Sequence, residues 1–168
     1  TGNIIGSTTG TGSITANVTT TAAVSFGIAN ASTSANIISK NSIGSITVTG
    51  NTTSISHGFV GIVTSSSGNT TISNNTIGST STSNSINAST ASTNTNGQPV
   101  VGIWSSSTGT VTINNNIVAN INNAYGGTGT STFFGQLRGI LVGTALSTSV
   151  AEISTGVSVV GNSIYNLT

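Results

Sequence analysis

The chain has 168 residues and a net charge of +1, with only 2% charged side chains, while Thr, Ser and Asn make up about half of it. A chain with so few basic residues has no electrostatic footprint for nucleic acid, and no apolar run approaches the roughly 20 residues of a membrane-spanning helix. Because cysteine is absent, disulfides, thiol catalysis and cysteine-based metal sites are excluded.

The composition predicts a folded, all-β chain. Disordered chains combine low hydrophobicity with high charge, whereas 34% of these residues are hydrophobic. Thr, Val and Ile favour strands, and Gly, Asn and Ser favour turns. Leu, Glu, Lys and Met, which build helices, are scarce or absent.

An Asn followed two residues later by Ile or Val recurs along the chain, at spacings of 38, 34, 41 and 46 residues. It divides the chain into repeats 3–40, 41–74, 75–115 and 116–161, with the start of a further repeat at 162–168. A fixed period of this length is the signature of a repeat architecture. The recurring residues are Asn3, Asn41, Asn75, Asn116 and Asn162.

A Gly-Ile pair also recurs, and it precedes the next recurring Asn by 14, 14, 14 and 23 residues. Between the two anchors, Ile38, Ile72 and Ile113 each lie 11 residues after the Gly. A third apolar position lies five residues after the Asn, except where the six-residue insertions 8–13 and 80–85 delay it. Its members are Ile14, Ile46, Ile86, Ile121 and Leu167, and the Gly-Ile pairs begin at Gly27, Gly61, Gly102 and Gly139.

Fixed apolar positions separated by elastic polar segments predict three strands per repeat. We therefore expect one domain over residues 1–168, a right-handed parallel β-helix of four to five coils that is open at both ends, because one coil can bury its apolar side only against its neighbours. Asn suits the coil corners, since it tolerates left-handed backbone angles and its amide can bond to the same Asn one coil away. The five recurring Asn residues should form such a structural ladder.

The Gly-Ile strand is apolar on both faces. Strict alternation places the Ile of each pair, such as Ile62, toward the core. The opposite face is then either covered by the chain's own loops, such as 122–136, or open as a docking surface for a protein partner. This candidate apolar docking face comprises Phe59, Val63, Val100, Trp104, Leu137 and Leu141.

The inventory of reactive groups is too short for catalysis. Glu152 is the only acid, His57 the only histidine, and Lys40 and Arg138 the only bases. Glycoside hydrolysis needs two carboxylates, and a calcium site needs several hard oxygen ligands. We therefore expect no enzymatic activity, no catalytic residue, no metal site and no cofactor. Arg138 takes the place that Val60 and Val101 hold in other repeats, which calls for a partner such as Glu152 or a route to solvent.

The two ends of the chain carry the same part of the repeat and no charged cap. An exposed strand edge recruits another strand, so we expect a further coil to stack on each end, from the same longer chain or from a second copy. The candidate end-to-end contact comprises Asn3, Ile4, Ile5, Asn162, Ile164 and Leu167.

The motifs "TISNNTIGS", "VTINNNIVANI" and "GNSIYNLT" resemble the Ser/Thr/Asn-rich β-helix repeats of large secreted surface proteins, especially those of Bacteroidota. The resemblance implies an extracellular structural or adhesive role at a bacterial cell surface, as a subunit or segment of a fibre. Its partner would be itself or flanking repeats, and surface glycans are a further candidate; neither nucleic acid nor membrane insertion is expected. Two alternatives remain open, an ice-binding module and a carbohydrate-binding module that uses Trp104 or Tyr125 as a stacking platform.

Overall fold

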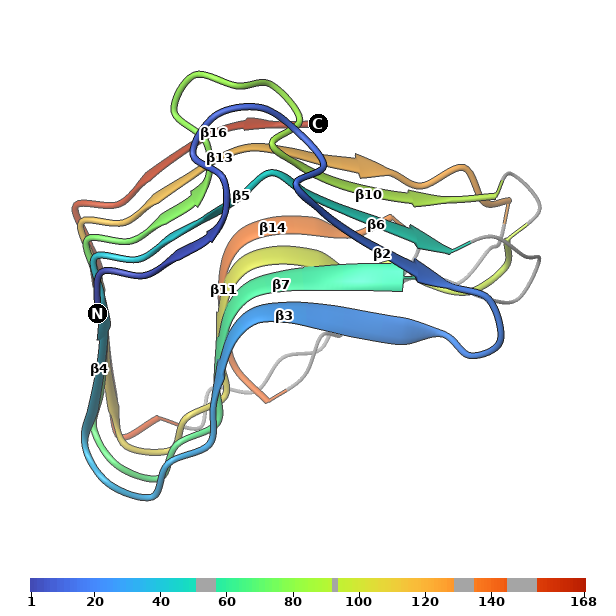
Figure 1. Cartoon of the computed structure of the whole chain (residues 1–168). Coiled ribbons are helices and arrows are strands. Elements are labelled where there is room, and N and C mark those ends of the chain that lie inside the picture. The colour runs from blue at the N-terminus through green and yellow to red at the C-terminus, as the bar shows by residue number, and fades with distance from the viewer. Residues whose placement is uncertain (51–56, 92–93, 129–134, 145–153) are drawn as a thin grey trace.

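The computed structural model describes residues 1–50, 57–91, 94–128, 135–144 and 154–168 of the chain. These residues form sixteen strands and no helix (Figure 1). The strands are β1 (Ile4–Gly6), β2 (Ile14–Val18), β3 (Ala23–Asn30), β4 (Asn36–Ser39), β5 (Ser42–Gly44), β6 (Ile46–Gly50), β7 (His57–Thr64), β8 (Thr70–Ser73), β9 (Thr76–Gly78), β10 (Ile86–Thr90), β11 (Val100–Ser105), β12 (Thr110–Asn114), β13 (Ile117–Ala124), β14 (Leu137–Val142), β15 (Gly156–Val160) and β16 (Ser163–Leu167).

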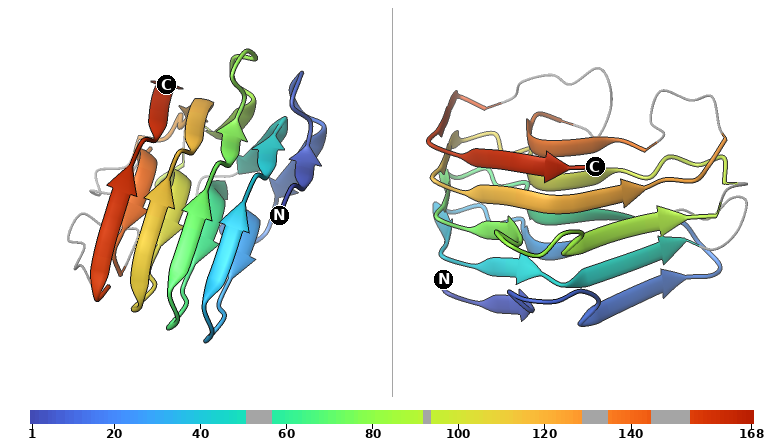
Figure 2. Two further views of the ribbon diagram at one scale, coloured as in Figure 1. Left: turned by 90° about the vertical axis from the view of Figure 1, so that its left-hand side faces the viewer. Right: turned by 90° about the horizontal axis from the view of Figure 1, so that it is seen from above.

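The strands form three parallel sheets that wind around one core. Sheet A follows the order β1-β5-β9-β13-β10-β6-β2, with β16 paired to β13; sheet B is β14-β11-β7-β3, and sheet C is β15-β12-β8-β4. In Figure 1 the chain turns clockwise, and Figure 2 shows that successive coils recede from that viewpoint, so the β-helix is right-handed. The predicted fold class is confirmed, with about three turns where four to five coils were expected.

Strand register matches the repeat alignment, including its insertions. Ile14, Ile46, Ile86 and Ile121 are aligned partners in sheet A, with Leu167 next in the column. In sheet C, Ile38, Ile72, Ile113 and Val159 are aligned in the same way. The insertions therefore leave the sheet as loops without shifting the pairing, because a one-residue slip would turn every apolar side chain to the outer face.

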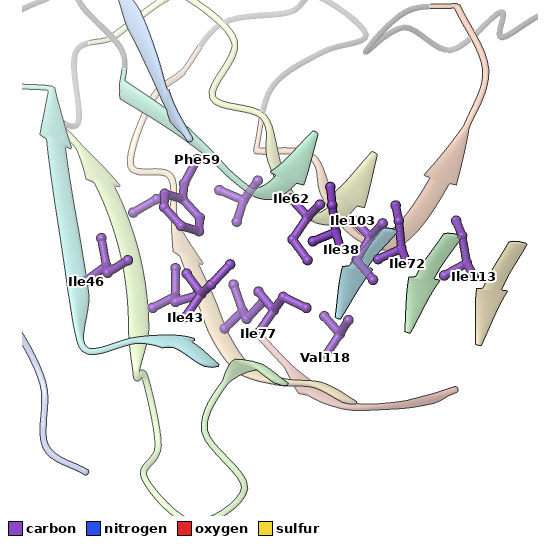
Figure 3. Packing of buried hydrophobic residues seen from close by; sticks show 14 of the residues in the cluster. Ile38, Ile43, Ile46, Phe59, Ile62, Ile72, Ile77, Ile103, Ile113 and Val118 are labelled. Carbon is purple, nitrogen blue, oxygen red and sulfur yellow. The ribbon is translucent and has the colours of Figure 1, made fainter. Parts of the chain in front are cut away.

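Columns of equivalent side chains fill the core. Ile43 and Ile77 of sheet A, Ile62 and Ile103 of sheet B, and Ile72 of sheet C all belong to one buried cluster. Figure 3 shows these columns meeting between the sheets. Burial of this apolar surface offsets the chain entropy lost on folding, and each internal coil contributes the same set of side chains.

The Gly of each Gly-Ile pair lies where sheet B comes closest to sheet A. A Cβ added to Gly61 would lie 2.5 Å from the carbonyl oxygen of Gly102 on the next strand and 2.5 Å from Cγ2 of Ile77. At Gly139 the nearest atom would be Cγ2 of Ile164, at 2.7 Å. Real Cβ atoms do not approach other atoms so closely, so this column requires glycine for space.

We predict that Gly61→Ala lowers the free energy of unfolding by about 3 kcal/mol, because overpacking a rigid core costs roughly 1–3 kcal/mol and the backbone of a neighbouring coil must also move. Gly156→Ala is the matched control, since a Cβ there meets nothing within 4 Å. Urea unfolding followed by circular dichroism measures both variants. Equal stability of the two would contradict the close approach.

Candidate functional site

The recurring Asn residues form a continuous hydrogen-bonded ladder along one corner of the solenoid. The Nδ2 of Asn3 donates to Oδ1 of Asn41 at 3.0 Å, Asn41 to Asn75 at 2.9 Å, Asn75 to Asn116 at 2.9 Å and Asn116 to Asn162 at 2.9 Å. The backbone N–H of each of the four donors also bonds to the same oxygen, at 2.9–3.1 Å. Each rung is thus a two-donor contact directed toward the C-terminal coil.

The three middle residues of the ladder are buried. Asn41, Asn75 and Asn116 are at most 2% exposed. The Nδ2 of Asn75 also donates to the carbonyl of Ile38, and that of Asn116 to the carbonyl of Ile72. Because each amide is paired above and below, its burial carries little desolvation penalty.

The left-handed backbone conformation falls one residue before the ladder, which corrects the expectation that the ladder Asn itself adopts it. Lys40, Asn74 and Asn115 have φ of 57°, 56° and 54°, and Gly2 and Gly161 hold the same place at 74° and 64°. The ladder Asn then has an ordinary φ, which lets its N–H and its side chain reach one acceptor together. Gly and Asn tolerate the left-handed region, so the column mostly uses them.

A second corner ladder, which the sequence pattern did not reveal, precedes the Ile46 column. Ser13 Oγ and Ser45 Oγ are 2.7 Å apart, and the backbone N–H of Ser45 donates to Ser85 Oγ at 3.0 Å. Further along, Asn166 Nδ2 donates to Asn120 Oδ1 at 3.3 Å. The signal that could have found it is a small polar residue directly before each apolar residue of that column.

The candidate docking face is divided between two buried clusters, which corrects the expectation of a single outer face. Phe59 and Val100 lie in the main core and Leu137 packs against it, whereas Leu141, with Val63 and Trp104 beside it, belongs to a second cluster on the outer side of sheet B. The reason is the glycine: alternation breaks there, so Phe59 and Ile62 both face inward although they are three positions apart, an odd spacing that strict alternation would place on opposite faces. Val60 and Val101 of the second cluster are fully buried, whereas Phe26, which aligns with Val60, is exposed.

The two aromatic residues proposed as sugar platforms are engaged within the fold. The indole N–H of Trp104 donates to the carbonyl of Gly143 at 3.0 Å. The hydroxyl of Tyr125 donates to the carbonyl of Asn94 at 3.1 Å, and its ring packs beside Gly135. Both side chains are partly buried.

The residues of the candidate end-to-end contact lie on edge strands. Asn3 precedes β1 and Asn162 precedes β16; among the described strands, β1 pairs with β5 alone and β16 with β13 alone. Ile4 is 66% exposed and Ile164 is 47% exposed, whereas Ile5 and Leu167 are partly buried against the core. Ile5 and Ile164 belong to one column, with Ile43, Ile77 and Val118 between them.

The titratable side chains of the described residues lie on different elements, with His57 on β7 and Arg138 on β14. His57 is buried, its Nε2 lies 2.7 Å from Ser25 Oγ, and desolvation by burial lowers its pKa, a shift that backbone groups of Thr49 and Ala16 partly oppose. Arg138 aligns with Val101 on the outer side of sheet B, and Glu152 lies outside the described residues. Among the described residues no group of three His, Cys, Asp or Glu side chains could hold a metal ion.

Comparison with known protein families, curated proteins and solved structures finds no match to this chain. The described part of the chain contains no helix long and apolar enough to cross a membrane. A function for this chain therefore has to be argued from the geometry of the parallel β-solenoid itself.

We predict that Asn75→Ala lowers the free energy of unfolding by about 3 kcal/mol or more. The substitution leaves the N–H groups of Asn41 without their acceptor and the buried carbonyl of Ile38 without its donor, at roughly 1–3 kcal/mol for each stranded group. Asn3→Ala, at the exposed end of the ladder, should cost well under half as much. Denaturant unfolding measures both, and equal losses would contradict a cooperative buried ladder.

We also predict that stability falls as the pH drops below about 6.5, the ordinary pKa of histidine. The unfolded chain takes up a proton on His57 there, whereas burial lowers the pKa in the folded state and keeps the ring neutral. His57 is the only histidine, so a His57→Gln variant should show a flat profile between pH 5 and 7. The measurement is the urea midpoint against pH, and a wild-type curve as flat as that of the variant would contradict the assignment.

Proposed function

We propose that this chain is an extracellular structural and adhesive protein whose coils stack end to end, as a subunit or segment of a surface fibre. The observation that carries the proposal is the direction of the Asn ladder. Every internal rung has donors on its N-terminal member and an acceptor on its C-terminal member. The two ends of the ladder are therefore complementary to each other and not to themselves.

The complementarity of the two ends extends to single atoms. Within the described residues, Oδ1 of Asn3 accepts no hydrogen bond, and the backbone N–H of Asn162 has no Asn acceptor. A second copy placed with its Asn3 beyond Asn162 would supply that acceptor. The backbone supports the same arrangement, since Ser163 N–H donates to the carbonyl of Asn116 as Ser42 N–H does to that of Asn3, and Ile4 of the next copy could donate to Asn162 in the same way.

The apolar surface at the ends supports the same contact. Ile164 lies in the core column but is 47% exposed because no coil covers it, and Val157 and Val159 of β15 are similarly placed. On the other end, Phe26 is exposed on β3 and Ile4 on β1. Head-to-tail stacking would cover the exposed core side chains Ile164, Val157 and Val159, and would pair three strand edges at once. A contact of this kind does not close on itself, so it generates a filament.

The composition supports an extracellular site for such a fibre. A surface of hydroxyls and amides with a net charge of +1 has little of the charge repulsion that keeps cytosolic proteins apart. The proposal places the fibre at a bacterial cell surface, because the repeats resemble the Ser/Thr/Asn-rich repeats of Bacteroidota surface proteins. The proposal assigns the chain neither a catalytic group nor a cofactor, and neither nucleic acid nor a lipid bilayer as its partner.

The ice-binding alternative has less support. Thr47 and Thr49 both lie on the outer side of sheet A, where a regular array of Thr would order water. Their aligned neighbours are Asn87 and Ser89 on β10, and Thr15 and Asn17 on β2. The pair of Thr residues is thus confined to one coil and does not extend into the array that ice binding requires.

The test is assembly of the purified 168-residue chain. We expect electron micrographs of concentrated protein to show unbranched filaments, and fibre diffraction to show a reflection near 4.8 Å along the filament axis. Ile164→Lys should abolish the filaments, because stacking would bury the new charge without a partner. Thr71→Lys, on the outer side of sheet C, is the matched control and should leave them intact.

Ile164 is 47% exposed in a single copy, so Ile164→Lys should fold as Thr71→Lys does, which circular dichroism measures. Monomers of the wild-type chain at millimolar concentration, measured by light scattering, would contradict the proposal. Filaments that persist in Ile164→Lys would contradict the proposed contact.

A further inference from the structure

Two loops of equal length rise from the outer side of sheet A. Residues 7–13 connect β1 to β2, and residues 79–85 connect β9 to β10, whereas the coil between them makes the same corner with Ser45 alone. The two loops thus stand on either side of a low coil, as the view from above in Figure 2 shows. Near their bases the hydroxyl of Ser79 donates to the carbonyl of Thr8 at 3.2 Å, which ties one loop to the other.

The space beside these loops is a polar hollow of about 370 Å³. Its floor is formed by outward side chains of sheet A, namely Thr47, Asn87 and Asn122, which follow one another on β6, β10 and β13. Its walls come from Thr11 of the first loop and from Ser83 and Asn84 of the second. The volume lies at the lower end of the range for small-ligand sites, which suits one or two sugar rings.

The floor has hydrogen-bonding capacity that the fold leaves unused. Asn122 Nδ2 donates to Asn87 Oδ1 at 2.7 Å, which fixes the orientation of both amides. Within the described residues, Asn87 Nδ2 and the hydroxyl of Thr47 have no protein partner, so both point to solvent with donors available. Neighbouring strands hold them at a spacing of about 4.8 Å, so the groups are preorganised on a rigid sheet rather than on a loop.

The chemistry of the lining selects the class of ligand. The lining residues are uncharged, so an anion or cation entering the hollow would lose its hydration without gaining a counter-charge. An apolar ligand would strip water from the amides and hydroxyls and leave them unpaired. A neutral polyhydroxylated compound avoids both penalties, because it carries no charge and its hydroxyls donate and accept hydrogen bonds as water does.

We propose that this hollow is a binding site for a short unit of a neutral glycan, held by hydrogen bonds to Thr47, Asn87 and Asn122 of the floor and to Ser83 of the second loop. The site lies on the side of the solenoid, where its floor residues point outward from sheet A rather than along the solenoid axis, so the proposal does not depend on end-to-end stacking. It also uses none of the aromatic residues of the fold, so we expect weak binding, at millimolar sugar concentrations.

Saturation-transfer difference NMR tests the proposal, since it reports weak ligands of single copies and of filaments alike. The probes are cellobiose, maltose and N,N′-diacetylchitobiose, with digalacturonic acid as the charged comparison. We expect saturation transfer to at least one neutral disaccharide and none to the uronate. Thr47→Val keeps the side-chain shape and Ser83→Ala changes an exposed loop residue; each should weaken that binding roughly 3- to 10-fold, as expected for one lost hydrogen bond.

Thr71→Val is the matched control, because Thr71 is also an outward strand residue but lies on sheet C. It should bind the sugar as the wild type does, and circular dichroism should show all three variants folded. Absence of transfer to every neutral probe at millimolar concentration would overturn the proposal. Equal affinity of Thr47→Val, Ser83→Ala and Thr71→Val would overturn the location of the site, and equal binding of the uronate would overturn the ligand class.

Discussion

The structure depends on one constraint: each coil must present to the next coil a surface that fits it at a separation of about 4.8 Å. Every strand side chain therefore has the residue at the same place in the next coil as a neighbour, and the most regular columns hold residues that pair with themselves. Asn does so through its amide, Ile through its shape, and Gly through the absence of a side chain. The ladder from Asn3 to Asn162, the Ile43–Ile77 column and the Gly61–Gly102 column are three solutions to this requirement.

The same constraint explains the missing charge. Two like charges about 4.8 Å apart repel by roughly 3 kcal/mol at an effective dielectric constant of about 20, which exceeds the roughly 1 kcal/mol gained from a hydrogen bond. A charged column would thus destabilise the stack at every step. Of the chain's ionisable side chains, Lys40 shares its corner position with Gly2 and Asn74, Arg138 aligns with Val101, and His57 aligns with Ala23. Each of them stands alone in its column.

The repeat made the columns predictable from the sequence, because the Gly-Ile and Asn anchors, 14 residues apart in three of the four repeats, align the coils even where six-residue insertions follow the Asn. Three features were not predictable. The inward position of Phe59 depends on a break in alternation at Gly61, which a period of two cannot detect. The left-handed residue is Lys40 rather than Asn41, since the ladder geometry needs the Asn backbone N–H. The hollow joins residues of separate coils, and only the solenoid brings Thr11 near Ser83.

Loops at the coil corners escape the stacking constraint, because a segment that leaves the sheet need not match its equivalent one coil away. Variation between coils is concentrated there: the corner before the Ile46 column is one residue in one coil and a seven-residue loop in its two neighbours. Under the proposed stacking, each subunit would place one such hollow along a fibre at a regular interval. Sites that bind a sugar only weakly would then act together on a surface that carries many copies of it, and linked sites raise avidity by factors of about 10² to 10⁴ without any new contact. The stack would supply the repetition, and the corner loops would supply the recognition.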